Sequence, residues 1–322
     1  MEVLSVIIQF LTELIKQFFT SGDFLNLFSN GGVLLPKPGA AASKSLLSAS
    51  PDTPPSLPSC GRPLVNPSAP LLQFVPGKRQ RVMGGSVAVP DSWPWTVALQ
   101  RDGQLRCGAT LIDQEYVATA AHCVTRFRTT PSRYTAILRS HALNSGERVP
   151  IMHIAVHELW TRFPLNRWAY DIALLKLGKR VELNRSALPA CLPTILPSAD
   201  SVCVTTGWGT FTPGSKTRSP LMREAKVPVV PSGVCNDLRH YKGRIHPVSM
   251  MCAGYEEGGE DACQGDSGGP LVCKFGDKWE LQGIISGCGC DGCGRANKPG
   301  VYTKVLTFVP WIKSQMFKLR RL

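Results

Sequence analysis

Hydrophobic and polar positions follow three patterns along the 322-residue chain. Residues 36–76 are rich in proline, serine and alanine, a composition that does not build a packed core. The first twenty residues instead carry apolar side chains at intervals of three and four, on one face of a helix. These are Val3, Leu4, Ile7, Ile8, Leu11, Leu14, Ile15, Phe18 and Phe19. We therefore expect an amphipathic or signal-like segment at 1–35 and a linker and pro-segment at 36–81.

The third pattern begins at residue 82, where short runs rich in β-branched and aromatic residues alternate with glycine, proline and aspartate. Such runs are typical of strands, and their close spacing indicates an all-β sandwich or barrel. The clearest runs lie at 96–99, 116–118, 172–177, 281–286 and 301–305. Trp311, Ile312 and Phe317 have helical spacing, which predicts a terminal helix over 309–319. Residues 82–322 are therefore expected to form one β-rich domain.

Polar side chains at Glu2, Gln9, Glu13, Lys16 and Gln17 interrupt the apolar stretch at the N-terminus. They exclude a transmembrane span there and make a secretory signal atypical. An atypical signal, an interfacial membrane helix and a helix that packs on a partner remain as interpretations. We favour the first because the cysteine content of the chain points to export.

Twelve cysteines favour a secreted, disulfide-bonded protein over a cytosolic one, in which thiols stay reduced. Structural zinc sites usually use two CxxC pairs, and this chain has only Cys290 with Cys293. No metal is therefore expected.

The formal net charge of +13 favours contact with acidic surfaces such as sulfated polysaccharide, anionic lipid or nucleic acid. A solvated basic surface without a dedicated ligand is the alternative. The sequence contains no recognisable nucleic-acid-binding module, so no specific nucleic acid is expected.

The ten residues from Asp261 to Pro270, DACQGDSGGP, place Ser267 in a glycine-rich turn. A serine hydroxyl needs a base, a group that orients the base, and backbone N–H donors before it acts as a nucleophile. A flexible Gly/Ser loop is the alternative for this segment alone. Two other segments supply suitable groups, since His122 lies in TAAHC and Asp171 precedes an apolar run. The order His, Asp, Ser is that of the chymotrypsin template.

With these segments in place, the chain resembles the trypsin/chymotrypsin-like serine endopeptidases from about residue 60 to about residue 317. Besides the three segments above, the resemblance rests on RVMGG at 81–85, SWPW at 92–95, CGATLI at 107–112, GWG at 207–209 and NKPGVY at 297–302. It implies an all-β fold of two six-stranded antiparallel barrels with a C-terminal helix. It also implies an active site in the cleft between the barrels.

The resemblance implies a catalytic role for each residue of the triad. Ser267 would form an acyl-enzyme, His122 would act as general base and Asp171 would orient the histidine. The backbone N–H groups of Gly265 and Ser267 would form the oxyanion hole.

Specificity is also implied. Asp261, six positions before Ser267, would lie at the base of the pocket for the side chain that precedes the cut, which Ser286 and Gly300 would also line. Because an unpaired buried carboxylate is costly, this residue would select Arg or Lys in the substrate.

Residues 78–81, KRQR, form a short basic run at the segment that resembles the family's activation junction. Cleavage after Arg81 would free the α-amino group of Val82, which would then pair with Asp266. We therefore expect the protein to be made as a zymogen.

The resemblance implies five disulfides: Cys60–Cys191, Cys107–Cys123, Cys203–Cys273, Cys235–Cys252 and Cys263–Cys293. The first would keep the pro-segment attached after activation. Cys288 and Cys290 are left over. They have four alternatives: pairing with each other, pairing with another chain, competing with Cys293 for Cys263, or staying free. Residues 184–186, NRS, form a glycosylation sequon at Asn184.

The chain departs from the family's pattern in two loops. After Ser286 the family usually has a tryptophan that walls the cleft, whereas residues 287–293 read GCGCDGC and are two residues longer. We therefore expect substrate residues further from the cut to bind differently. The loop between Leu138 and Val149 lacks the glutamate pair that binds calcium in trypsins, so neither calcium nor another cofactor is expected.

The sequence thus favours a secreted serine endopeptidase that cleaves after Arg or Lys. Its expected partners are protein or peptide substrates, an activating protease, protein inhibitors and a polyanion surface. One alternative is a non-catalytic polyanion- or receptor-binding protein on the same fold, against which the intact triad argues. The other, an esterase or transferase, rests only on the versatility of common folds.

Overall fold

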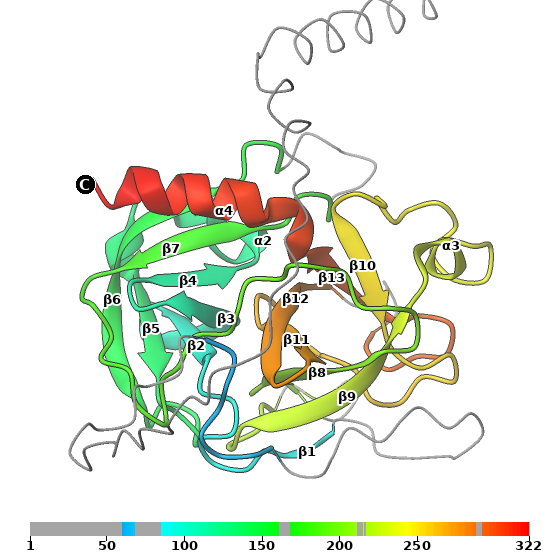
Figure 1. Cartoon of the computed structure of the whole chain (residues 1–322), viewed down its shortest axis with the longest axis horizontal. Helices are drawn as coiled ribbons and strands as arrows, with labels where there is room; N and C mark the ends of the chain where they lie inside the picture. The colour runs from blue at the N-terminus through cyan, green and yellow to red at the C-terminus, as the bar shows by residue number, and fades with distance from the viewer. Residues whose placement is uncertain are drawn as a thin grey trace, which may run out of the picture. The chain divides into compact units, whose positions relative to one another are not determined.

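The computed structural model describes residues 60–67, 85–160, 168–210, 215, 217–287 and 292–321. The amphipathic segment expected at 1–35 lies outside the described residues, as do Arg81, Val82, Cys288 and Cys290. In the described part of the chain, no helix has the length and apolar character needed to span a membrane. Figure 1 shows two groups of short strands and a C-terminal helix.

The first six-stranded group closes into a barrel in the order β2-β3-β4-β7-β6-β5. All neighbouring strands are antiparallel, and the interior is filled by fully buried aliphatic side chains such as Val97, Leu111 and Leu175. The strands are β2 (Thr96–Arg101), β3 (Gln104–Asp113), β4 (Tyr116–Thr119), β5 (Tyr134–Leu138), β6 (Glu147–Val156) and β7 (Ala173–Leu177).

The second group follows the order β9-β10-β13-β12-β11-β8 and closes because β9 also pairs with β8. The short strand β1 (Ser86–Val87) lies on the part of the β9 edge that β10 leaves open, with Ser86 opposite Glu224. The barrel strands are β8 (Val202–Gly207), β9 (Arg223–Val230), β10 (Met250–Ala253), β11 (Pro270–Phe275), β12 (Lys278–Gly287) and β13 (Gly300–Lys304). The expected pair of six-stranded antiparallel barrels is confirmed within the described residues.

The C-terminal helix α4 (Val305–Leu319) follows β13 directly and packs on β7 and β12 (Figure 1). It begins four residues before the predicted start at 309 and contains Pro310, which has no N–H to donate. Buried Val305 and Phe308 account for the earlier start, because packing of an apolar face contributes more to helix stability than local propensity does. The remaining helices are short: α2 (Ala121–Val124), η1 (Thr125–Phe127), η2 (Pro131–Arg133) and α3 (Ser232–Cys235).

Buried polar contacts join the two barrels. The hydroxyls of Thr96 and Thr206 lie 2.7 Å apart, and the Trp93 indole donates to Glu224 at 2.7 Å. The Gly108 N–H donates to the Ser267 carbonyl at 2.8 Å. These contacts bring the loops that carry the candidate site residues to the junction between the barrels.

Five disulfides are present among the described residues, and they join the pairs implied by the resemblance: Cys60–Cys191, Cys107–Cys123, Cys203–Cys273, Cys235–Cys252 and Cys263–Cys293. Cys60–Cys191 closes a separation of 131 residues. Beside it, the Gly61 N–H donates to Pro189 at 2.7 Å, and the Gly61 carbonyl accepts the Trp279 N–H at 2.8 Å. Residues just before the β-rich domain are therefore attached to it by covalent and backbone bonds.

Candidate active site

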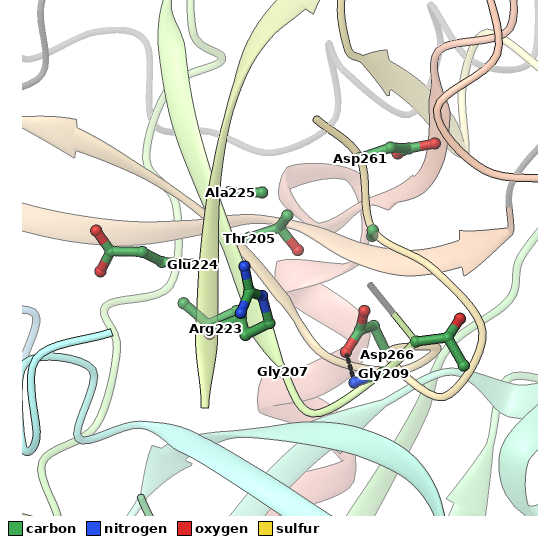
Figure 2. A pocket seen from close by; sticks show the side chains of 11 residues that line it. Thr205, Gly207, Gly209, Arg223, Glu224, Ala225, Asp261 and Asp266 are labelled. Atoms are coloured by element: carbon green, nitrogen blue, oxygen red, sulfur yellow. Dashed lines mark hydrogen bonds between the residues drawn. The ribbon is translucent and has the colours of Figure 1, made fainter. Parts of the chain in front are cut away.

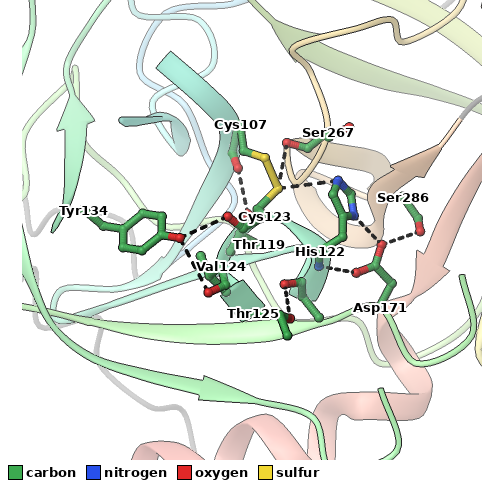
Figure 3. The surroundings of a disulfide bond; sticks show 12 residues. Cys107, Thr119, His122, Cys123, Val124, Thr125, Tyr134, Asp171, Ser267 and Ser286 are labelled. Carbon is green, nitrogen blue, oxygen red and sulfur yellow. Dashed lines mark hydrogen bonds and ion pairs between the residues drawn. A yellow bond between two sulfur atoms is a disulfide. The ribbon is translucent and has the colours of Figure 1, made fainter. Parts of the chain in front are cut away.

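His122 and Asp171 meet where helix α2 and strand β7 approach each other. His122 lies in α2, directly after β4, and Asp171 lies two residues before β7, which pairs with β4. The His122 Nδ1 atom is 2.7 Å from Asp171 Oδ2, and the His122 backbone N–H donates to Oδ1 at 2.9 Å (Figure 3). The pairing of β4 with β7 thus brings His122, which follows β4, into hydrogen-bond contact with Asp171, which precedes β7.

The Asp171 carboxylate is fully buried but well supplied with donors. Ser286 Oγ donates to Oδ2 at 2.6 Å, in addition to the two donors from His122 (Figure 3). Ser286 was expected beside the substrate, and the structure shows this further contact, which the sequence analysis did not identify. The Asp171 backbone is also held, since Thr303 Oγ1 donates to its carbonyl at 2.6 Å.

Opposing effects act on the His122 imidazole. Burial works to lower its pKa, but the charge of Asp171 and the hydrogen bond to it outweigh burial and raise the pKa above the ordinary 6.5. The side chain still keeps 34% of its surface exposed. His122 is therefore a base that stays accessible while its protonated form is stabilised.

Ser267 lies in a turn just before β11. The backbone of this turn requires glycine at a position before Ser267 and at the position after it. Gly265 and Gly268 have φ angles of 100° and 83°, which L-residues with side chains rarely adopt. A Cβ atom at Gly268 would lie 2.5 Å from the Gly108 carbonyl oxygen. The Cys107–Cys123 disulfide borders this turn, and Cys123 Sγ is 3.7 Å from both the Ser267 carbonyl and His122 Nε2 (Figure 3).

Within the described residues, Ser267 Oγ makes no hydrogen bond to the His122 ring. Such bonds are often long in ligand-free catalytic sites and shorten when substrate binds. The backbone of the turn offers free donors, because the N–H groups of Gly265 and Ser267 have no acceptor in the part of the chain that the structure describes. By contrast, those of Asp266, Gly268 and Gly269 donate to backbone carbonyls. Two N–H groups on either side of Asp266 are thus available to an external oxygen.

Cys107, His122 and Cys123 place their potential ligand atoms within 4.8 Å of one another. Metal binding by cysteine requires a thiolate. These two sulfur atoms are bonded to each other, so this group does not suit a metal ion.

Asp261 has one carboxylate oxygen that finds no partner in the part of the chain that the structure describes. Oδ2 accepts the Gly294 N–H at 2.9 Å, whereas the buried Oδ1 has no hydrogen bond among the described residues. A Cβ atom at Gly300 would lie 2.6 Å from Oδ1, so the glycine leaves the space beside it open. Burial raises the pKa of Asp261 to about 7, with the Gly294 and Ala262 N–H groups opposing it. The arrangement suits a cationic group that would pair with Oδ1.

The Asp266 carboxylate lies next to Gly209, which follows the end of β8 (Figure 2). Its Oδ1 accepts the Gly209 N–H at 2.7 Å, and its Oδ2 accepts the Cys263 N–H at 3.0 Å. Burial raises the pKa of this carboxyl to about 6. Side chains at Gly207 and Gly209 would collide with it, since their Cβ atoms would lie 2.1 and 2.4 Å from its oxygens.

A pocket adjoins Asp266 and extends to Asp261 (Figure 2). Residues of β8 and β9, among them Gly207, Arg223 and Glu224, line its other side. Arg223 Nη2 also donates to the Gly85 carbonyl, which places the start of the described domain next to this pocket.

The remaining expected sites lie apart from this region or outside the described residues. Asn184 is exposed, and its Oδ1 accepts the N–H groups of Ser186 and Ala187 at 2.9 and 3.1 Å. The Arg81–Val82 junction and the Cys288 and Cys290 positions lie outside the described residues.

Comparison with known families agrees with the fold and with the geometry around His122, Asp171 and Ser267. The family model named Trypsin matches residues 82–312, which is well over half of the chain. The match begins at the expected activation junction and ends within α4. The chain therefore belongs to the trypsin family and is a serine protease of the chymotrypsin type.

Proposed function

We propose that this protein is a secreted, trypsin-like serine endopeptidase that is made as a zymogen and hydrolyses peptide bonds after Arg or Lys. The family and the several disulfides are typical of secreted proteins, which supports the location. The observation that carries the specificity is the buried Asp261 Oδ1 atom, which has no hydrogen-bond partner among the described residues.

In the proposed mechanism, Ser267 Oγ attacks the scissile carbonyl carbon while His122 Nε2 takes the hydroxyl proton. His122 then gives this proton to the leaving amine, and the acyl group remains on Ser267. In the second half-reaction, His122 takes a proton from water while the water oxygen attacks the acyl carbon. His122 then gives this proton to Ser267 Oγ as the bond to the acyl group breaks and the acid product leaves. Asp171 fixes the ring through Nδ1, at 2.7 Å, and stabilises the imidazolium that forms in each half.

The oxyanion of each tetrahedral intermediate needs donors that are already in place. The Gly265 and Ser267 N–H groups suit this role because both lack an acceptor among the described residues. The positive φ of Gly265 sets the orientation of its peptide group.

Selection of Arg or Lys follows from the electrostatics of Asp261. A guanidinium or ammonium group beside Oδ1 would remove the cost of the unpaired oxygen and favour its ionised form. A neutral substrate side chain would leave the buried oxygen without a charged partner, so it would bind less tightly. Gly300 supports the same specificity, because any larger residue would fill the space next to Oδ1.

The pocket beside Asp266 supports activation by cleavage after Arg81. Gly85 is fixed next to Arg223 and Glu224, which line the pocket. Val82 lies three positions before Gly85, and an extended chain of that length reaches about 10 Å. A new α-amino group at Val82 could thus reach the pocket and pair with Asp266. Pairing would make the conformation of the Gly265–Ser267 turn depend on cleavage, because Asp266 is part of that turn.

Cys60 gives the activated protein a two-chain form in this proposal. The Cys60–Cys191 bond links residues before Arg81 to the protease domain. The pro-segment would remain attached after cleavage. An activating protease and protein inhibitors are the proposed partners besides substrate, and Asn184 is a proposed glycosylation site on the exposed surface.

The test compares purified precursor before and after cleavage at Arg81 on peptides that differ only in Arg, Lys, Phe or Val before the cut. We expect activity only after cleavage, with Arg and Lys preferred. Ser267→Ala should abolish it, and Arg81→Gln precursor should stay inert. Serine-dependent activity with a Phe preference would refute the role of Asp261. Full activity of Arg81→Gln would refute the zymogen.

A further inference from the structure

Three arginines surround one aromatic ring on the first barrel. The guanidinium carbons of Arg133, Arg101 and Arg126 lie 4.0, 4.9 and 5.3 Å from the centre of the Phe127 ring. Arg106 is close enough to this group to act electrostatically on its single carboxylate, Asp102. We call Arg101, Arg106, Arg126 and Arg133 the basic cluster.

Strand pairing and a disulfide hold the basic cluster together. In the β2–β5 ladder Arg101 lies opposite Tyr134, the neighbour of Arg133. The Cys107–Cys123 disulfide ties β3, which carries Arg106, to α2, which leads directly into Arg126 and Phe127. The backbone positions that carry the arginines are therefore held together by the core of the barrel, so a common ligand would not need to order the backbone.

Positive charge in the basic cluster is poorly compensated. Among the described residues, Asp102 is the one carboxylate paired with the basic cluster. Arg133 occupies both of its oxygens, with Nε to Oδ1 at 2.9 Å and Nη2 to Oδ2 at 2.5 Å. Arg101 Nε is 3.8 Å from the same carboxylate. The hydrogen bond from Arg133 and the charges of the surrounding arginines lower the pKa of Asp102. Arg106 and Arg126 are exposed and form no ion pair with any described residue.

The chemistry of the basic cluster favours a sulfated ligand. Guanidinium groups present planar forks that match sulfate, phosphate and carboxylate oxygens. Binding of single-stranded nucleic acid relies on open aromatic faces, and Phe127 is half-buried with arginines around it. A membrane anchor needs exposed apolar side chains, and between residues 88 and 151 the structure places no large one at the surface.

We propose that the basic cluster is a binding site for a linear sulfated polysaccharide. Such polymers lie outside the cell, which is the location given to this protein in the proposed function. The site is distinct from the substrate pocket at Asp261, although Phe127 lies only five positions after His122 in the sequence. Binding there would hold the protease on a sulfated matrix without requiring catalysis, so the Ser267→Ala protein serves for the measurement.

The experiment measures the affinity of full-length Ser267→Ala protein for immobilised heparin at several salt concentrations. Hyaluronan, which carries no sulfate, an oligothymidylate and phosphatidylserine vesicles serve as competitors. The log of the binding constant should fall linearly with the log of salt concentration, as counterion release requires. Heparin should bind at least about tenfold more tightly than the three competitors near physiological salt.

Matched variants separate the basic cluster from the net charge of the protein. Arg106→Gln with Arg126→Gln should weaken heparin binding about tenfold and reduce the salt slope by about two. Lys313→Gln with Lys318→Gln removes the same charge from exposed positions of α4 and should change affinity less than about twofold. Arg106→Lys with Arg126→Lys should keep the salt slope, which shows that the variant surface is intact.

Equal losses in the Arg106/Arg126 and Lys313/Lys318 glutamine variants would overturn the proposal, since net charge alone would then explain binding. Equal affinity for oligothymidylate or hyaluronan would overturn the choice of a sulfated ligand. Preferential binding to the vesicles would assign the surface to a membrane instead. None of these results depends on whether the protein cleaves peptides, so failure of the proposed protease specificity would be recognised separately.

Discussion

Asp171 holds His122 by both its ring and its backbone, with Oδ2 2.7 Å from Nδ1 and Oδ1 2.9 Å from the backbone nitrogen. The carboxylate is fully buried, and Ser286 donates to it as well. Rotation of the imidazole would leave a buried charge without one of its donors, which is costly. Nε2 therefore stays directed toward the Cys123 and Ser267 side of the site.

Replacing Asp171 with Asn should reduce kcat by about 10⁴, the effect seen in the trypsin template when the histidine loses its correct tautomer. Ser286→Ala should reduce kcat by only about tenfold, because it removes one of three donors to the same carboxylate. Steady-state kinetics on one Arg peptide would measure both. A Ser286→Ala loss as large as that of Asp171→Asn would contradict the ranking.

The pH profile should reflect the raised pKa of His122. The imidazole acts as a base only when it is neutral, so kcat/KM should fall as pH decreases through that pKa. Asp171 raises it above 6.5, which places the midpoint of the acid limb above 6.5. Residual activity of Asp171→Asn should show a midpoint at lower pH, because the negative charge is gone. Profiles of the two proteins with the same midpoint would show that Asp171 does not set this pKa.

Asp261→Asn should abolish the preference for Arg and Lys and should also stabilise the ligand-free protein. Burial raises the folded-state pKa of Asp261 from 3.8 to about 7. The folded state therefore binds the proton more tightly than the unfolded state, and stability decreases as pH rises from about 4 to 7. At pH 8 the Asn variant should be more stable by about 1 to 3 kcal/mol.

Urea unfolding in a Ser267→Ala background, at pH 4 and pH 8, would measure this difference without self-digestion. The stability gain should be larger at pH 8 than at pH 4. A gain of the same size at both values would exclude the ionised carboxylate as its cause.

Gly209→Ala should impair activation while leaving cleavage at Arg81 intact. The new Cβ would lie 2.4 Å from Asp266 Oδ2 and would displace the carboxylate that is to pair with the new α-amino group. We expect activity to fall at least about tenfold, as for loss of a charged hydrogen bond. Gly233→Ala is the matched control, because a Cβ there has no heavy atom within 4 Å. Peptide hydrolysis after complete cleavage would compare them, and equal activities would contradict this role of the glycine.

The Cys60–Cys191 disulfide should keep the two chains of the activated protein covalently linked. After cleavage at Arg81, a non-reducing gel should show one species and a reducing gel two. The double variant Cys60→Ser with Cys191→Ser should release the pro-segment and lose about 2 to 4 kcal/mol of stability in the precursor. Peptide mapping that finds Cys60 as a free thiol would contradict the linkage.

Local patterns in the sequence predicted much of the fold. The five predicted strand runs coincide with β2, β4, β7, β12 and β13 to within a residue or two, apart from β12, which extends three residues earlier than its run. Strand identity follows from short-range composition and glycine or proline punctuation. The start of α4 was placed four residues too late, because burial of Val305 and Phe308 depends on β7 and β12, which are distant in the sequence.

The sequence by itself determined the family, the strand-rich domain and the identity of the residues around Ser267, because motifs in a fixed order carry that information. Tertiary structure alone decided which distant groups meet. It placed the Ser286 hydroxyl on Asp171 and gathered arginines from two segments around Phe127. It also left Asp261 Oδ1 without a donor among the described residues. Such contacts depend on strand register and barrel closure, which join residues as distant as Asp171 and Ser286, 115 positions apart. Composition and spacing report only on near neighbours.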